Sequence, residues 1–203
     1  MGNIFSYFSD KKKARLYKNL LDVSSSPAIL DRFTALQNEV VVDYDTKVIA
    51  IAGVTNDDLS AYFAKAYADT YAHNGASCLI IDANMYEPRL AEIVGKNEVE
   101  PGKVVELSEK VSAVFFNKEI YPGTVIKGGA IHKVVEDNKD KFDHILILLP
   151  AIKKHKEVVL VSDIIQTSIL VAQKNRTKKK SIFNAVAYFH IENLPLAKTV
   201  ILA

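Results

Sequence analysis

The turn near position 55 carries polar and acidic side chains where the pattern of the chain suggests phosphate chemistry. The stretch from Lys47 to Leu90 reads as strand, tight turn, helix, turn and strand, the order in which a phosphate-binding α/β domain begins. Such a turn needs glycines, which let backbone N–H groups surround the phosphates, and a lysine, which neutralises their charge. In place of these residues, the turn carries Asn56, Asp57, Asp58, Leu59 and Ser60. The chain can therefore have the fold of a nucleotide-binding domain without having its binding site.

The two carboxylates of this turn, Asp57 and Asp58, stand at the predicted start of a helix. At that place they would satisfy free N–H groups and the positive end of the helix dipole. They would also repel a triphosphate. At an effective dielectric constant of about 20, each carboxylate about 4 Å from a phosphate charge costs on the order of 4 kcal/mol before relaxation. The turn therefore predicts poor nucleotide binding.

A basic run near the C-terminus is the best electropositive patch for an anionic partner. It follows an apolar strand pattern and precedes a helix pattern, so we expect a strand-to-helix loop on the side where α/β folds place their ligands. A solvated helix start is the alternative reading. The cations of this run are Lys174, Arg176, Lys178, Lys179 and Lys180.

The elements that position these residues alternate between strand and helix patterns. Apolar runs of strand length, without clean alternation, occur at 47–54, 77–83, 111–117, 144–151, 168–173 and 199–203. Helical stretches occur at 28–42, 59–74, 129–142 and 178–191. Strands that are apolar on both faces and alternate with helices predict a three-layer α/β domain with a mostly parallel central sheet flanked by helices.

Bulk properties fit one globular domain. The chain has 203 residues, of which 49% are hydrophobic, with a net charge of +2. This charge gives no case for nucleic acid as a partner, and the scattered histidines predict no metal site. Lone Cys78 fits a reducing cytoplasm, and no apolar run is long enough to span a bilayer. Ile4 and Phe5 precede a cluster of lysines, so residues 1–15 are a candidate membrane-surface or partner contact. We expect a segment 1–23 and a domain 24–203.

Several segments, in order and spacing, resemble one known family. The segment at 27–42 reads PAILDRFTALQNEVVV, that at 74–90 reads NGASCLIIDANMYEPRL, and that at 141–151 reads KFDHILILLPA. Together with the strand and basic loop at 168–182, they resemble the bacterial tyrosine kinases of capsule and exopolysaccharide synthesis, the BY-kinases. More broadly they resemble the MinD/ParA group of deviant-Walker P-loop ATPases. The resemblance covers about residues 24–203 and implies a P-loop NTPase-like fold with ATP and magnesium as the family's cofactors.

The positions that the family uses for chemistry are altered. By the spacing from Gly75 and Asp82, the Walker A lysine position falls on Ser60 and the position of the magnesium-binding Ser/Thr falls on Ala61. The second-strand motif keeps Asp82 but has Asn84 in place of its partner aspartate, and the Walker B aspartate falls on Leu148. An amide cannot take a proton and a leucine cannot bind magnesium. Asp82, Asn84 and Leu148 are therefore predicted to be vestigial, with no cofactor expected.

Two accessory features of the family are altered as well. The E-x-x-R-x-x-R helix motif through which BY-kinases assemble falls on Asp31, Thr34 and Gln37, so its arginines are missing. The printed sequence also ends at Ala203 without a tyrosine-rich tail.

Three functional hypotheses follow. The favoured one is a catalytically inactive BY-kinase-like pseudo-kinase, a cytoplasmic interaction module at the inner face of the plasma membrane in capsule or exopolysaccharide synthesis or export. Its partner would be a polysaccharide co-polymerase, a chain-length regulator or a second copy of the chain. The first alternative is an active nucleotide-binding ATPase or tyrosine kinase with phosphate contacts relocated to Lys65, Arg89 or the basic loop, and with Asp82 as the metal or water contact. The second is a MinD/ParA-like positioning protein bound to membranes through residues 1–15.

Overall fold

A computed structural model of the chain describes residue 23 and the ranges 26–40, 45–96, 98–119 and 121–202. The candidate contact at 1–15 lies outside these residues, and so does the predicted N-terminal segment 1–23 except for Val23. No helix of the described part is long and apolar enough to cross a membrane.

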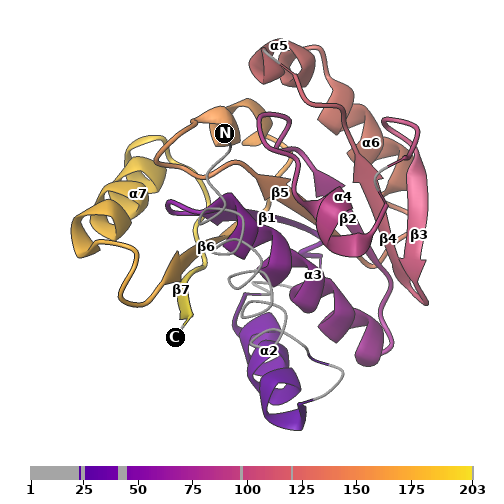
Figure 1. Ribbon diagram of the computed structural model, residues 1–203, viewed down its shortest axis with the longest axis horizontal. Helices are drawn as coiled ribbons and strands as arrows, with labels where there is room; N and C mark the ends of the chain where they lie inside the picture. Colours follow the sequence, from indigo (N-terminus) through magenta and orange to yellow (C-terminus); the bar gives the residue numbers. More distant parts are fainter. Residues whose placement is uncertain (1–22, 24–25, 41–44, 97, 120, 203) are drawn as a thin grey trace, which may run out of the picture.

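A central sheet of seven strands organises the described chain (Figure 1). Its strands are β1 (Val48–Gly53), β2 (Cys78–Asp82), β3 (Val104–Ser108), β4 (Val111–Phe115), β5 (His144–Leu149), β6 (Thr167–Gln173) and β7 (Lys198–Leu202). They lie in the order β3-β4-β2-β5-β1-β6-β7, and every neighbouring pair is parallel except the antiparallel pair of β3 and β4. The predicted sheet is confirmed.

Helices cover both faces of the sheet. They are α2 (Pro27–Val40), α3 (Asp57–His73), α4 (Leu90–Val94), α5 (Pro122–Lys127), α6 (Ala130–Asn138) and α7 (Lys179–Ile191), with the 3-10 helix η1 at Glu157–Val161. One buried cluster joins α2, α3 and α4 to one face of the sheet, and a second joins α5, α6, η1 and α7 to the other. Alternate strand residues enter the two clusters, for example Ile49 and Ala50. This explains why the strands read as continuous apolar runs, and it confirms the three layers.

The strand β3 was not predicted. All of its residues are exposed or half-buried, so it lacks the apolar run that marks the other strands. It lies at the edge of the sheet and pairs with β4 alone. The six predicted strands are all present, and α3 begins at Asp57, two residues earlier than its pattern indicated.

The helix α2 packs against α3 through polar side chains as well as through Phe33. Gln37 donates to the carbonyl oxygen of Tyr67 at 3.0 Å, and Asn74 donates to the Thr34 hydroxyl at 3.1 Å. The positions where the BY-kinase pattern would have arginines for assembly are thus engaged within the chain.

Candidate functional site

The turn between β1 and α3 is tight and ends in a side-chain cap. Asn56 is the N-cap of α3, and its side-chain oxygen accepts from the Leu59 N–H at 3.1 Å. A Cβ added at Gly53 would lie 2.3 Å from the Asn56 carbonyl oxygen, so only glycine fits at that point. The turn keeps a compact strand-to-helix form without the phosphate-binding residues.

Asp57 points away from its own helix, toward the loop that follows β5. Its side chain is 4% exposed. One carboxylate oxygen accepts from the Ala151 N–H at 2.7 Å and the other from the Lys154 ammonium at 2.8 Å. The expectation that Asp57 would satisfy the free N–H groups of its helix is therefore wrong. Asn56 caps the helix, and Asp57 satisfies a buried N–H group 94 residues along the chain.

The same loop also bonds to the backbone of the turn. The Ile152 N–H donates to the Gly53 carbonyl at 2.9 Å, and the Lys153 N–H donates to the Val54 carbonyl at 3.1 Å. With the two bonds to Asp57, four hydrogen bonds fasten residues 151–154 onto residues 53–57. In all four bonds the turn is the acceptor, through two backbone carbonyls and the Asp57 carboxylate, and the loop after β5 is the donor.

The next turn of α3 is closed to solvent. Ser60 and Ala61 are fully buried, and the Ser60 hydroxyl donates to the Asp57 carbonyl at 2.9 Å. The predicted Walker A lysine position therefore holds a short side chain that bonds back to its own helix.

The three residues predicted to be vestigial lie side by side at the carboxyl ends of the central strands. In register, Asp82 of β2 lies opposite Leu148 of β5, and Leu148 lies opposite Ile51 of β1. Asn84 follows Asp82 after one residue and is also buried. The register therefore places Asp82 and Leu148 at the carboxyl ends of strands next to β1, the strand that leads into the turn.

Asp82 has a structural role in this arrangement. Its carboxylate accepts from the N–H groups of Asn84 at 3.1 Å and Leu90 at 3.2 Å, which shapes the loop after β2. Burial raises the pKa of Asp82 to about 7, against the opposing effect of these two bonds. Asn84 closes the same loop, because its side chain donates to the Glu87 carbonyl at 3.0 Å and accepts from the Glu87 N–H at 3.3 Å.

Ion pairs bind the loop after β2 to the turn. Lys154 lies 2.8 Å from Asp57 and 3.3 Å from Glu87. Arg89 lies 3.1 Å from Asp58. Lys154 and Glu87 could not be recognised from the sequence, because each acts on residues distant in the chain. Arg89, a predicted phosphate contact of the alternative hypothesis, is paired with Asp58.

The basic run begins in the loop between β6 and α7, as predicted, and its last two lysines, Lys179 and Lys180, are the first residues of α7. The Thr177 hydroxyl lies 3.5 Å from the hydroxyl of Thr55, so the loop reaches the turn. Lys65 is elsewhere: it forms an ion pair with Asp69 at 2.5 Å within α3, and both line a cavity of about 540 Å³ together with His73. Of the proposed relocated phosphate contacts, Lys65 is thus the one remote from the turn.

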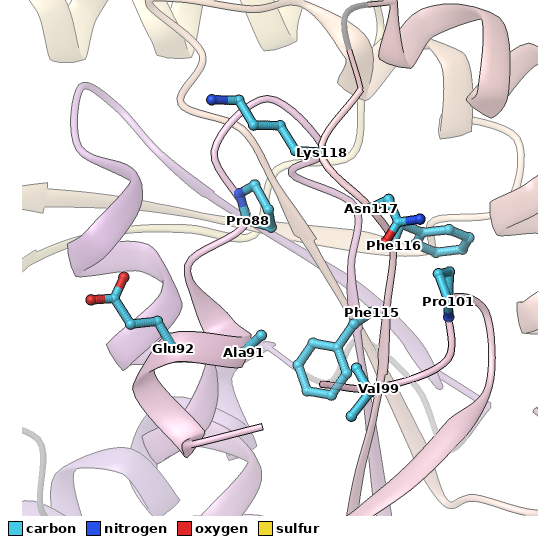
Figure 2. Close-up of a pocket in the computed structure, with 9 residues that line it drawn as sticks. All are labelled: Pro88, Ala91, Glu92, Val99, Pro101, Phe115, Phe116, Asn117 and Lys118. Carbon is cyan, nitrogen blue, oxygen red and sulfur yellow. The ribbon is translucent and has the colours of Figure 1, made fainter. Parts of the chain in front are cut away.

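A cavity of about 510 Å³ lies beside this site, between α4 and the end of β4 (Figure 2). Phe115 points toward Ala91 and Val99, while Glu92 and Lys118 lie at its margin. No group of three or more metal-ligating side chains occurs among the described residues.

The fold defines a class first: a three-layer α/β domain with a mostly parallel central sheet. No model of a known protein family matches the chain, and no curated protein matches it in sequence. Solved structures do match, and they narrow the fold to that of BY-kinase kinase domains. The chimerical protein CapA2B2 superposes with a TM-score of 0.82 at 15% identity, covering 91% of this chain and 90% of that one. The VpsO kinase domain gives 0.73 at 14% identity, covering 96% and 98%.

Two further matches show the breadth of the likeness. The kinase domain of the Escherichia coli tyrosine kinase ETK gives a TM-score of 0.70 at 14% identity, covering 79% of this chain and 68% of that one. A chain of the MinC:MinD cell division protein complex of Aquifex aeolicus gives a TM-score of 0.61 at 16% identity, covering 76% of this chain and 68% of that one. The chain therefore has a BY-kinase-like deviant P-loop fold, and the predicted resemblance is confirmed at the level of fold.

Proposed function

We propose that this chain is a BY-kinase-like pseudo-kinase, an interaction module that does not bind or hydrolyse ATP. The observation that carries the proposal is the set of four hydrogen bonds that fastens the loop after β5 onto the turn after β1. A phosphate at the turn would have to displace Asp57 from two partners and then lie beside its charge. The Walker A lysine that would bind the phosphate is missing, because Ser60 stands at that position, and the nearby Lys154 is already paired with Asp57 and Glu87.

The residues do not fit a magnesium ion either. Magnesium prefers oxygen ligands in near-octahedral geometry. Leu148 offers none, and the side-chain oxygen of Asn84 already accepts from Glu87. Asp82 is buried, bonded to two backbone N–H groups, and has its pKa raised to about 7 by that burial, which disfavours the charged form a metal needs.

The pathway and partner follow from the resemblance to BY-kinases. It implies a role in capsule or exopolysaccharide synthesis or export, at the inner face of the plasma membrane. The partner would be a polysaccharide co-polymerase, a chain-length regulator or a second copy of the chain. Matching folds are found in assemblies, as in the MinC:MinD complex, which supports a protein partner in general.

The test is thermal unfolding with and without magnesium and ATP, alongside a phosphate-release assay. We expect no rise in melting temperature and no hydrolysis above a buffer blank. A magnesium-dependent rise at micromolar ATP contradicts the proposal.

A second candidate is an active nucleotide-binding protein that uses relocated contacts. One observation favours it: the basic loop reaches the turn through Thr177 and Thr55. This reading predicts ATP binding that is lost in Arg89→Ala or in a variant with the loop lysines changed to glutamine, and activity that is lost in Asp82→Ala. Lys65→Gln serves as the matched control, because Lys65 is held by Asp69 away from the turn.

The MinD/ParA-like positioning function is tested separately. Deletion of residues 1–15 abolishes sedimentation with liposomes if that segment is the anchor, and leaves it unchanged if it is not.

A further inference from the structure

The outer side of α7 and the loop before it form one continuous exposed surface, which we call the α7 surface. Its apolar members are Phe183, Ala187 and Ile191, and its charged members are the cations of the basic loop, Lys174, Arg176, Lys178, Lys179 and Lys180. α7 lies at the margin of the molecule, near β6 and β7 (Figure 1).

The apolar members lie in a single row. Their spacing of four residues places them on the same side of the helix, and eight residues of helix span about 12 Å. Phe183 is 73% exposed and Ile191 is 77% exposed, whereas Ala185 and Phe189 on the opposite side are buried against the sheet. One side of α7 thus packs against the sheet. The row formed by Phe183, Ala187 and Ile191 lies on the other side and faces outward, with no described residue covering it.

The cations of the α7 surface are all exposed, and none forms an ion pair with a described residue. Other exposed lysines, such as Lys96 and Lys127, also have no ion pair among the described residues, but nowhere else in the described chain do five such cations fall within seven residues. The loop is therefore a concentration of uncompensated positive charge.

The placement of the lysines also opposes the stability of the helix. Lys178 is the N-cap of α7 and makes no side-chain cap bond, and Lys179 and Lys180 are its first residues. The N-terminus of a helix carries the positive end of the dipole, where acidic side chains stabilise and cations destabilise. Three consecutive cations at that position conflict with local stability, and such conflicts mark functional surfaces.

We propose that the α7 surface docks on an anionic membrane, with the basic loop at the lipid headgroups and with Phe183 and Ile191 inserted at the boundary of the acyl chains. Anionic lipid attracts basic segments, and exposed aromatic and aliphatic side chains gain by leaving water at that depth. A soluble polyanion would use the cations without the apolar row. The inference does not depend on the state of the nucleotide site, and it concerns residues other than 1–15.

The test is co-sedimentation of the full chain with phosphatidylcholine vesicles, with and without phosphatidylglycerol. We expect binding only to the vesicles that contain phosphatidylglycerol, and weaker binding at high salt. Changing Lys178, Lys179 and Lys180 to glutamine is expected to lower the partition coefficient on the order of 100-fold. Phe183→Ser with Ile191→Ser is expected to lower it about tenfold or more.

Matched controls lie at the opposite edge of the sheet. A variant with glutamine at Lys96, Lys103 and Lys118 removes the same charge, and Val104→Ser removes an exposed apolar side chain near β4. Both are expected to bind vesicles better than the corresponding α7 variants.

Three outcomes overturn the proposal. The first is no binding of the full chain to anionic vesicles. The second is binding that survives both α7 variants and is lost on deletion of residues 1–15. The third is loss in the lysine variant with none in the Phe183 and Ile191 variant, which shows charge attraction to the headgroups without insertion of the apolar row. The melting temperature of each variant shows whether a loss of vesicle binding is caused by unfolding. The lysine variant is expected to be at least as stable as the wild type, because it removes cations from the N-terminus of a helix.

Discussion

Replacing Asp57 with alanine should weaken the fold far more than an acidic surface residue can. Asp57→Ala leaves the buried Ala151 N–H without an acceptor, which costs about 1–3 kcal/mol. It also removes the ion pair with Lys154, whose side chain is 43% exposed, and a pair of that exposure is worth about 0.2–1 kcal/mol. The expected loss in free energy of unfolding is about 1–4 kcal/mol, or about 3–15 °C in melting temperature for a chain of this size.

Two substitutions calibrate this result. Asp57→Asn keeps an oxygen for the Ala151 N–H but loses the charge opposite Lys154, so its loss should be about 1 kcal/mol. Asp58→Asn removes a pair with Arg89 in which both side chains are more than 40% exposed, and it should cost about 0–1 kcal/mol. The assay is urea denaturation followed by circular dichroism. If Asp57→Ala costs no more than Asp58→Asn, the loop after β5 is not held by Asp57 as described.

Stability should depend on pH with opposite signs at two buried or bonded aspartates. Burial raises the pKa of Asp82 to about 7. Its contribution to the free energy of unfolding is therefore fully present below the usual carboxyl pKa of about 3.9 and is lost as the pH rises toward about 7. Across that range, the difference in free energy of unfolding between the wild type and Asp82→Asn should shrink. Hydrogen bonds from Ser77 lower the pKa of Asp143, so its contribution is present at neutral pH and lost in acid, and Asp143→Asn should flatten the acid limb instead. Gly53→Ala should cost about 2 kcal/mol or more, because the new Cβ meets the Asn56 backbone at 2.3 Å. Gly123→Ala, where the nearest atom is a Leu160 methyl at 3.7 Å, should be neutral or slightly stabilising, by about 0.5 kcal/mol, and equal effects at the two glycines would contradict the tight turn.

Most of the sheet could be predicted from the sequence because burial on both faces leaves a long apolar run. That signal is present in β5, where five of six residues are buried, and absent in β3, which has no buried residue. An edge strand that pairs on one side and faces solvent carries little pattern, so β3 could not be recognised.

The composition of the candidate site could be predicted, and its bonding could not. Asp82, Asn84 and Leu148 lie at or just after the ends of predicted strands. The sequence could place them at one edge of the sheet, because the carboxyl ends of parallel strands lie at the same edge. The hydrogen-bond partners of Asp57 are the Ala151 N–H and the Lys154 ammonium, which lie more than ninety residues further along the chain. A sequence shows the carboxylate and the helix start next to each other, and so it suggested a capping role that Asn56 in fact fills.

The central claim, that this site no longer receives a nucleotide, is tested most directly by isothermal titration of the chain with ATP and magnesium at neutral pH. The fastened loop and the carboxylate of Asp57 predict no heat of binding above dilution. A saturable, magnesium-dependent isotherm with micromolar affinity would contradict it.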